Sequence, residues 1–222
     1  MIRSAAFLLA LILLLPVAAR AEVFALGEKT FVYDVPDGFV QLDPVRHRQY
    51  FNLFESILPP GVNLAAIIFT VADEAALSRG EPFTLDEYII IGNEKMTSSI
   101  TWDREMFNLY KGQFTSGAVD LTQLAHTLMK ERIHEATGLD LEIMFSKPVV
   151  IDEDDDFFSM GIKPEGGTDS ADFELYIIVN SLLMDGKLIQ VHQFKSVDSE
   201  ADIVDFIAVH KDVLKAMNIR PR

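Results

Sequence analysis

The sequence contains no cysteine. Disulfide bonds and a lipid anchor on cysteine are therefore excluded, and the folded chain has to be held together by its own hydrophobic core. Basic residues are also scarce, because 19 Lys and Arg stand against 34 Asp and Glu, for a net charge of -15. An acidic chain of this kind repels phosphate backbones and anionic lipid surfaces, so we expect neither nucleic acid nor a membrane surface as its partner.

The local motifs of the common catalytic classes are missing as well. There is no G-x-S-x-G nucleophile elbow, no G-x-x-x-x-G-K phosphate loop and no G-x-G-x-x-G. His134 and Glu135 begin like a zinc-binding H-E-x-x-H motif, but Gly138 takes the place of the second histidine. A pair of carboxylates that hydrolyses glycosidic bonds is recognised by the distance between the two groups in space, which the sequence does not show. The sequence therefore favours a noncatalytic protein, with a motif-poor, hydrolase-like enzyme as the alternative.

A long apolar run occurs only at the N-terminus. A short basic start, residues 1–3, precedes the apolar residues 5–15, and residues 19–21 (Ala-Arg-Ala) have the small-x-small form of a cleavage site. With the alanines and valine up to residue 19 the apolar run is about 15 residues with Pro16 near its end, which is short of the roughly 20 that a membrane-spanning helix needs. These features predict a secretory signal peptide, residues 1–21, that is cleaved after Ala21.

The mature chain is expected to be a single α+β domain, residues 22–222. Cleavage removes the positive charges of Arg3 and Arg20, so the net charge becomes -17. Abundant apolar residues argue against disorder, and no later segment is apolar over enough residues to span a bilayer. We therefore expect a periplasmic or secreted protein of the bacterial envelope that does not insert into a membrane after cleavage.

Alternating apolar residues and turn signals predict most of the secondary structure. In TFVYDVPDGFVQL, residues 30–42, two short strands flank a tight turn at Pro36-Asp37-Gly38. The capping-box spacing of Thr84 and Glu87 predicts that a helix starts at Leu85. The middle of the chain is then predicted as a strand over 63–73, a helix over 85–98, a helix over 119–136 and a strand over 139–145. Two segments, 46–58 and 101–114, are ambiguous between helix and strand.

The strongest local prediction is a hairpin near the C-terminus. Two strand-like runs, 172–184 and 187–196, are joined by Asp185-Gly186, whose tolerance of positive φ fits a two-residue type I′ turn. This turn sets the register and predicts four opposite pairs: Met184 and Lys187, Leu183 and Leu188, Val179 and His192, and Ile177 and Phe194. Apolar residues then fall on both faces, so we expect a sheet that is covered on both sides. An amphipathic helix beginning near Ser199 supplies one of the covers.

Three of these segments together resemble the PsbP-like superfamily, which is named after an extrinsic subunit of photosystem II. They are the turn YDVPDGF (33–39), the C-terminal hairpin and the final helix SEADIVDFIAVHKDVLKAM (199–217). Phe39 stands where many relatives carry Trp, and the longer, more helical segment near 81–138 predicts an insertion. The resemblance implies an α/β/α sandwich, a mainly antiparallel central sheet covered by helices on both faces. Members are mostly binding or accessory proteins, so the resemblance implies no catalytic residues.

Five consecutive acidic residues in VIDEDDDFF, residues 150–158, raise the question of a metal site. Asp152, Asp154 and Asp156 match the first three ligands of an EF-hand loop. The sixth position, however, is Phe157 where the loop needs glycine, and the twelfth is Lys163 where it needs glutamate. The sequence therefore favours a solvated turn, and it leaves open a weak nonstandard Ca²⁺ site that would make the protein a cation-responsive module. No other cofactor is predicted.

Three polar residues of the hairpin form the other candidate site. The predicted register places His192, Gln190 and Ser181 on one largely apolar face of the sheet. A core histidine with a hydrogen-bond partner is one interpretation. The other is a small-ligand pocket under a helix, because a few polar groups among apolar walls are typical of such sites. We therefore expect a small molecule or an envelope protein as the partner, and the sequence decides neither between them nor the oligomeric state.

Overall fold

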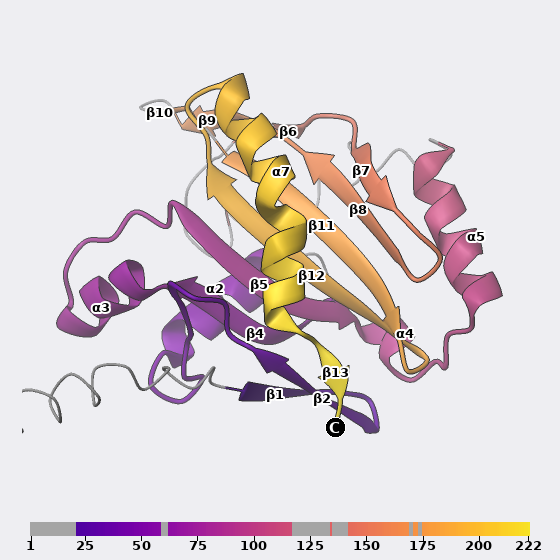
Figure 1. Cartoon of the computed structure of the whole chain (residues 1–222). Helices are drawn as coiled ribbons and strands as arrows, with labels where there is room; N and C mark the ends of the chain where they lie inside the picture. Colours follow the sequence, from indigo (N-terminus) through magenta and orange to yellow (C-terminus); the bar gives the residue numbers. More distant parts are fainter. Residues whose placement is uncertain (1–20, 59–61, 117–133, 135–141, 169–170, 173–174) are drawn as a thin grey trace, which may run out of the picture.

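A seven-stranded sheet forms the centre of the molecule in the computed structural model, which describes residues 21–58, 62–116, 134, 142–168, 171–172 and 175–222. Every neighbouring pair of its strands is antiparallel. In spatial order the strands are β3 (Phe39–Gln41), β4 (Val62–Thr70), β5 (Glu87–Glu94), β12 (Lys187–Ser196), β11 (Leu175–Met184), β8 (Phe157–Ile162) and β7 (Val149–Glu153). Helices lie on both sides of this sheet (Figure 1), which confirms the predicted α+β class.

The described helices are α2 (Arg48–Ile57), α3 (Val71–Arg79), α4 (Lys95–Ser98), α5 (Arg104–Thr115) and α7 (Glu200–Met217). Helix α7 crosses in front of the sheet and α2 lies behind it, whereas α5 lies beside the β7 end (Figure 1). Helices α3, α5 and α7 each have a side-chain N-cap. Thr70, Asp103 and Ser199 accept a hydrogen bond from a backbone N–H of the first turn of these helices. The predicted start of the last helix near Ser199 is thus confirmed.

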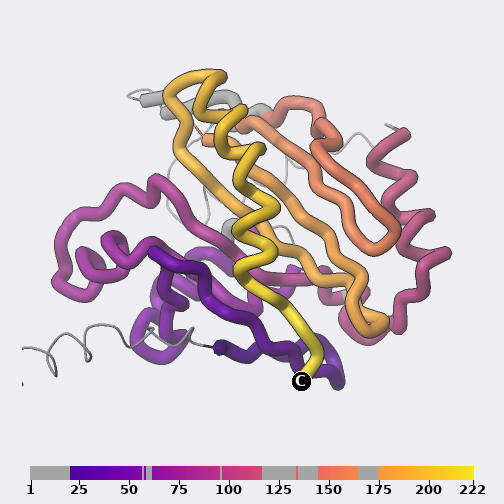
Figure 2. Tube along the Cα trace, viewed as in Figure 1, coloured from indigo at the N-terminus to yellow at the C-terminus, as the bar shows by residue number. Residues whose placement is uncertain are grey.

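Two three-stranded sheets accompany the central one. The first joins β1 (Ala21–Leu26), β2 (Lys29–Asp34) and β13 (Arg220–Pro221), and the second joins β10 (Ala171–Asp172), β9 (Pro164–Thr168) and β6 (Glu142–Phe145). In the first sheet the strand at residue 21 and the C-terminal strand flank β2, so the two ends of the described chain belong to the same small sheet (Figure 2).

The C-terminal hairpin has the register that its turn predicts. Asp185 and Gly186 both have positive φ, and all four predicted pairs are opposite one another. Alternation along β11 then gives the central sheet two distinct faces. We call them the α7 face, to which Ile178 and Asn180 point, and the α5 face, to which Val179 and Ser181 point.

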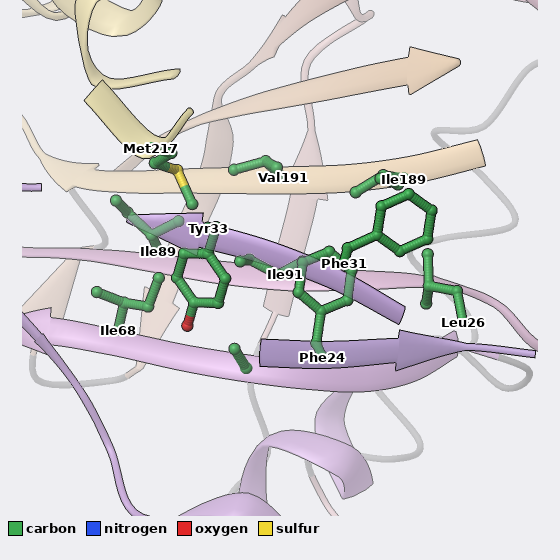
Figure 3. Packing of buried hydrophobic residues seen from close by; sticks show 11 residues of the cluster. Phe24, Leu26, Phe31, Tyr33, Ile68, Ile89, Ile91, Ile189, Val191 and Met217 are labelled. Atoms are coloured by element: carbon green, nitrogen blue, oxygen red, sulfur yellow. The ribbon is translucent and has the colours of Figure 1, made fainter. Parts of the chain in front are cut away.

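The core of the α7 face lies between the central sheet and the small sheet of β1, β2 and β13. Its buried residues are Phe24, Leu26, Phe31, Tyr33, Ala66, Ile68, Ile89, Ile91, Ile189, Val191 and Met217. Figure 3 shows Phe24, Phe31 and Tyr33 from the small sheet lying over the isoleucines of the central strands. Farther along the same face, Phe206 of α7 packs on Tyr176 and Ile178.

The α5 face is covered by α2 and α3 at one end and by α5 at the other. Phe54 of α2 contacts Phe69 and Ile90 at the β4 end. Phe107 of α5 packs with Phe158 and Leu188 at the β8 end. Both faces are therefore covered, as the apolar residues on both sides of the hairpin predict.

The predicted helix over 85–98 is wrong, because residues 87–94 form β5 in the middle of the central sheet. Leu85 has a φ of 55°, which is incompatible with the start of a helix. The run Ile89-Ile90-Ile91 is instead buried on both faces, between β4 and β12. Continuous β-branched residues are typical of such a central strand, so tertiary pairing outweighed the capping-box pattern.

The remaining predictions of secondary structure have mixed outcomes. The strands around the turn at Pro36-Asp37-Gly38 are confirmed as β2 and β3, and the ambiguous segments contain helices α2 and α5. The strand predicted over 63–73 ends at Thr70, where α3 begins. The helix predicted over 119–136 lies outside the described residues except for His134, and β6 covers the described end of the strand predicted over 139–145.

Candidate functional site

The α7 face carries a buried network of polar side chains that are hydrogen-bonded to one another and to the backbone. Asn180 Nδ2 donates to the carbonyl oxygen of Val191 at 2.9 Å, and Asn180 Oδ1 accepts from Ser159 Oγ at 2.9 Å. His210 Nε2 lies 3.4 Å from the same Ser159 oxygen, and His210 Nδ1 lies 2.5 Å from the carbonyl oxygen of Ile207. The side chains of Ser159, Asn180 and His210 are at most 3% exposed, so the network belongs to the interior.

A serine hydroxyl beside a histidine ring is also a feature of nucleophilic catalysis. Ser159, however, is 0% exposed and donates its proton to Asn180, which leaves neither the access nor the geometry of a nucleophile. Gln193 adds a second link from the sheet to α7 by donating to the carbonyl oxygen of His210 at 3.2 Å. This network therefore fixes α7 on the sheet.

The α5 face carries a second set of polar side chains, which we call the polar row: Trp102, Tyr110, Ser181, Gln190 and His192. Gln190 Nε2 donates to the Tyr110 hydroxyl at 3.1 Å, and the rings of Tyr110 and Trp102 lie 5.5 Å apart, edge to face. Ser181 is directly opposite Gln190 in the hairpin, and His192 is the next residue of β12 on the same face. The structure thus brings together the three residues predicted from the sequence and adds two from α5 and the loop before it.

Three buried polar atoms of the row have no hydrogen-bond partner among the residues that the structure describes: Trp102 Nε1, Ser181 Oγ and His192 Nε2. Ser181 is 0% exposed and Trp102 is 8% exposed, so water outside the protein does not replace the missing partners. Most buried polar groups in proteins are paired, and an exception requires an explanation. Ser181 and His192 lie on the α5 face of the sheet, and the ring of Trp102 packs on Tyr110, so all three exceptions fall within the polar row.

The electrostatics of the polar row are set by burial. Burial raises the pKa of the Tyr110 hydroxyl far above its ordinary value, the negative charge of Glu94 raises it further, and hydrogen bonding from Gln190 and the nearby Ser181 lowers it slightly. Ser181 is near enough for that effect, although the two hydroxyls do not have hydrogen-bond geometry. Burial also lowers the pKa of His192 to about 4. Both side chains are therefore uncharged at neutral pH.

Aromatic side chains flank the polar row at both ends. At one end His192 stacks on Phe194 with ring centres 6.3 Å apart, and Phe194 stacks on Tyr88 at 4.4 Å with an interplanar angle of 5°. At the other end Tyr110 meets Phe114 and Phe158 edge to face, at 4.8 and 5.8 Å. Polar atoms between apolar, aromatic walls form the kind of surface that holds a small molecule.

The acidic run lies at the β7–β8 turn, where the protein's own cations contact it. Arg104 of α5 binds Asp155 and Asp156 at 3.3 and 2.9 Å, and Lys111 of α5 lies 3.5 Å from Glu153. Lys211 of α7 pairs with Asp152. The backbone N–H of Asp156 donates to Asp154 Oδ1 at 3.0 Å, closing the turn.

Asp152 therefore points to α7, whereas Asp156 points to α5. Among the residues that the structure describes, no group of three His, Cys, Asp or Glu side chains is arranged to hold a metal ion. The cation site at Asp152, Asp154 and Asp156 stays a prediction.

Sequence reasoning missed Trp102 and Tyr110 as members of the polar row. Both lie in the segment 101–114, whose apolar pattern did not distinguish helix from strand. Asp103, which caps α5 by accepting from the Met106 N–H at 2.8 Å, is the signal that indicates a helix there. With α5 in place, Tyr110 follows Phe107 by three residues and reaches the same face of the sheet.

Comparisons with known proteins describe the fold. No protein-family model matches the sequence, and a comparison with curated proteins gives no match. The solution structure of cyanobacterial PsbP (CyanoP) from Synechocystis is similar over 92% of this chain and 94% of its own, with 13% identity and a TM-score of 0.44. The Saccharomyces cerevisiae Ran-binding protein Mog1p is similar over 91% of this chain and 96% of its own, with 14% identity and a TM-score of 0.39. The first of these structures is a PsbP, and the three sequence segments resemble the PsbP-like superfamily.

Proposed function

We propose that this protein is an exported, noncatalytic binding protein of the bacterial envelope, and that the polar row is its binding site. The observation that carries the proposal is the group of three unpartnered buried atoms, Trp102 Nε1, Ser181 Oγ and His192 Nε2. Leaving a buried polar group without a partner costs about 1 to 3 kcal/mol, so three together are a substantial cost in the free protein. A bound molecule that supplies partners recovers part of that energy, which is how the site gains affinity.

Cleavage after Ala21 is compatible with the first described strand. Strand β1 begins at Ala21, the residue after which cleavage is predicted, and its pairing with β2 continues to Leu26. A mature chain that begins at Glu22 keeps five of the six paired residues of this strand. Among the described residues, no helix is long and apolar enough to cross a membrane.

A binding role fits the described polar groups better than catalysis does. The Ser159 and His210 pair is enclosed by the packing of α7, and the titratable members of the polar row, Tyr110 and His192, are both held uncharged. General acid–base catalysis uses groups with a pKa near the working pH, and both of these pKa values are moved away from neutrality. The polar row therefore offers fixed hydrogen-bonding groups, which suit recognition.

The test uses Trp102, the only tryptophan of the chain, as a reporter inside the site. The chain is expressed with residues 1–21 in a Gram-negative host, and the periplasmic fraction is examined by intact mass for a product that begins at Glu22. This product is then titrated with small-molecule and protein fractions of an envelope extract while Trp102 emission is recorded. We expect a small-molecule fraction to shift the emission of the wild type and not of a Ser181→Ala, His192→Phe double variant. A full-length cytoplasmic product would contradict export, and emission that no fraction shifts would contradict the binding site.

A further inference from the structure

The contacts of His210 on α7 place an oxygen atom at each nitrogen of its ring. Nδ1 lies 2.5 Å from the carbonyl oxygen of Ile207, and a carbonyl oxygen accepts hydrogen bonds but never donates them. The proton of that contact therefore belongs to Nδ1. His210 is 3% exposed, so water outside the protein does not compete for the ring.

The contact at the other nitrogen also needs a proton from the ring. Nε2 lies 3.4 Å from Ser159 Oγ, and Ser159 donates its single hydroxyl proton to Asn180 Oδ1 at 2.9 Å. The amide of Asn180 is fixed in this orientation because its Nδ2 donates to the carbonyl oxygen of Val191. The contact between His210 and Ser159 is therefore a hydrogen bond when Nε2 carries a proton and Ser159 Oγ accepts it.

A neutral imidazole ring cannot make both contacts, because it carries one proton on its two nitrogens. With Nδ1 protonated, the lone pair of Nε2 faces the oxygen of Ser159. With Nε2 protonated, the lone pair of Nδ1 faces the carbonyl oxygen of Ile207. Either neutral form leaves one buried contact without a proton, which is costly in the interior. The doubly protonated ring completes a hydrogen-bonded chain from Ile207 through Ser159 and Asn180 to Val191.

The charges around His210 favour a positive charge on the ring more than they oppose it. Three basic side chains of the α7 face and of α7 itself lie in ion pairs: Lys211 with Asp152 of β7, Lys195 with Glu87 of β5, and Lys187 with Glu28. The other charged residues of α7 are Glu200, Asp202, Asp205, Asp212 and Lys215, so acidic groups outnumber basic ones on the helix. On β11, burial raises the pKa of Tyr176, which keeps this side chain uncharged.

We propose that His210 is a proton switch for α7: as the pH falls, its ring takes up the second proton, completes the chain to Ser159 and Asn180, and holds α7 more firmly on the central sheet. Imidazole is the side chain that changes its charge near neutral pH. A folded state that holds a proton more tightly than the unfolded chain gains stability as the pH falls. The switch is independent of the proposed binding site, which lies on the opposite face of the sheet.

The two buried histidines of the hairpin and of α7 then respond to acid with opposite signs. His192 Nε2 has no partner in the part of the chain that the structure describes, and burial lowers its pKa to about 4. Protonation of His192 therefore destabilises the fold, whereas protonation of His210 adds a hydrogen bond to it.

Two measurements on residues 22–222, at about pH 7.5 and about pH 5.5, test the switch. Long-range proton–nitrogen NMR correlations of the imidazole rings show whether each nitrogen of His210 carries a proton. Hydrogen exchange followed by mass spectrometry, corrected for the intrinsic exchange rate at each pH, gives the protection of α7 peptides. We expect both nitrogens of His210 to be protonated at the lower pH. Relative to His210→Gln, the protection of α7 should rise about 5- to 10-fold on acidification, which corresponds to one hydrogen bond.

The variants separate the switch from other effects of acid. Carboxylates titrate in the wild type and in His210→Gln alike, so the difference between the two isolates His210. Ser159→Ala keeps the histidine and removes the acceptor of its second proton, so we expect the pH response of α7 to disappear. His134→Gln is the matched control, because His134 is an exposed histidine, and it should keep the full response.

Protection of α7 that rises on acidification in the wild type and in His134→Gln, but not in His210→Gln or Ser159→Ala, supports the switch. A His210 ring that keeps one unprotonated nitrogen at the lower pH overturns it, and this result needs no variant to fold. A response of α7 that is the same in the wild type and in His210→Gln also overturns it. Both results leave the proposed binding function untouched, because that function is tested by Trp102 emission.

Discussion

At the scale of single residues, two buried serines show the difference between a structural and a binding role. Ser159 and Ser181 are both 0% exposed and lie on neighbouring strands, β8 and β11, with Ser159 on the α7 face and Ser181 on the α5 face. Ser159 has partners in Asn180 and His210, whereas Ser181 has no hydrogen-bond partner in the described part of the chain. Burial alone therefore says little about the role of a polar residue, and hydrogen-bond pairing decides it.

Replacing each serine by alanine tests this difference. Ser159→Ala leaves Asn180 Oδ1 without its donor, so we expect the free energy of unfolding to fall by about 1 to 3 kcal/mol. Ser181→Ala removes an atom that has no partner, so we expect a change close to zero or a small gain in stability. Urea unfolding followed by circular dichroism measures both values. An equal loss in the two variants would mean that the Ser181 hydroxyl has a partner in the folded protein.

His192 makes stability depend on pH in a defined window. Its pKa falls from 6.5 in the unfolded chain to about 4 in the folded protein because of burial. Between these values the unfolded state binds more protons, so the stabilisation that is complete above pH 6.5 is lost as the pH falls toward 4. This residue alone should account for a loss of roughly 2 to 3 kcal/mol over that range.

The measurement compares urea unfolding of the wild type and of His192→Gln from pH 4 to pH 7. The carboxylates titrate in both proteins, so the difference between the two curves isolates His192. We expect the curve of the variant to be flatter. Parallel curves would show that the imidazole is protonated to the same extent in the folded and unfolded states.

At the scale of elements, the acidic turn between β7 and β8 acts as an anchor for two helices. Arg104 and Lys111 reach it from α5, and Lys211 reaches it from α7, where it also lies over the Phe157 ring. The pKa of Arg104 is raised, chiefly by hydrogen bonding to Asp156. Exposed ion pairs contribute little individually, so the turn orients these helices more than it stabilises them.

Calcium tests whether the same carboxylates also bind a metal. Because basic side chains already contact them, we expect the thermal midpoint of the mature wild type to be the same in EDTA and in Ca²⁺. In the double variant Arg104→Ala and Lys111→Ala, the carboxylates lose these basic partners. Ca²⁺ should then raise the thermal midpoint of this variant, since a ligand that binds the folded state raises its apparent stability. Lys95→Ala is the control, because Lys95 is an exposed lysine of helix α4. A rise in the wild type that disappears in Asp154→Asn and Asp156→Asn would establish the predicted cation site.

At the scale of the whole molecule, the two ends of the described chain close one sheet. Arg220 of β13 contacts Asp34 of β2 through both of its terminal nitrogens, at 3.1 and 3.2 Å, and Asn218 donates to the same carboxylate at 2.8 Å. These contacts lower the pKa of Asp34, the Arg220 hydrogen bond most strongly. Ile219 packs against the core of the α7 face beside Met217. Among the last four residues, Ile219 therefore adds to the hydrophobic core and Arg220 adds an ion pair to the small sheet.

Removing those residues tests the closure. A chain of residues 22–218 loses the buried part of Ile219 and the pairing of β13 with β2, so we expect it to unfold about 2 kcal/mol more easily than residues 22–222. Arg222→Ala is the control, because it keeps the backbone hydrogen bond from residue 222 to Thr30. Guanidinium unfolding gives both values. Equal stability of the short and full chains would show that the small sheet holds without β13.

The sequence by itself determined the features that depend on near neighbours along the chain. The Asp185-Gly186 turn set the hairpin register, that register placed Ser181, Gln190 and His192 on one face, and the apolar spacing of residues 199–217 set the last helix. A turn and a periodicity act over a few residues, so they can be read without the rest of the fold.

Only the tertiary structure decided the features in which distant segments compete or meet. Residues 87–94 became a central strand because β4 and β12 pair with them on both sides, against the local helix signal. Trp102 and Tyr110 joined the polar row because α5 packs on the sheet, where Tyr110 accepts a hydrogen bond from Gln190, which comes 80 residues later in the chain. The partners of the acidic turn likewise come from α5 and α7. Pairing and burial are properties of the assembled sheet, so no local pattern contains them.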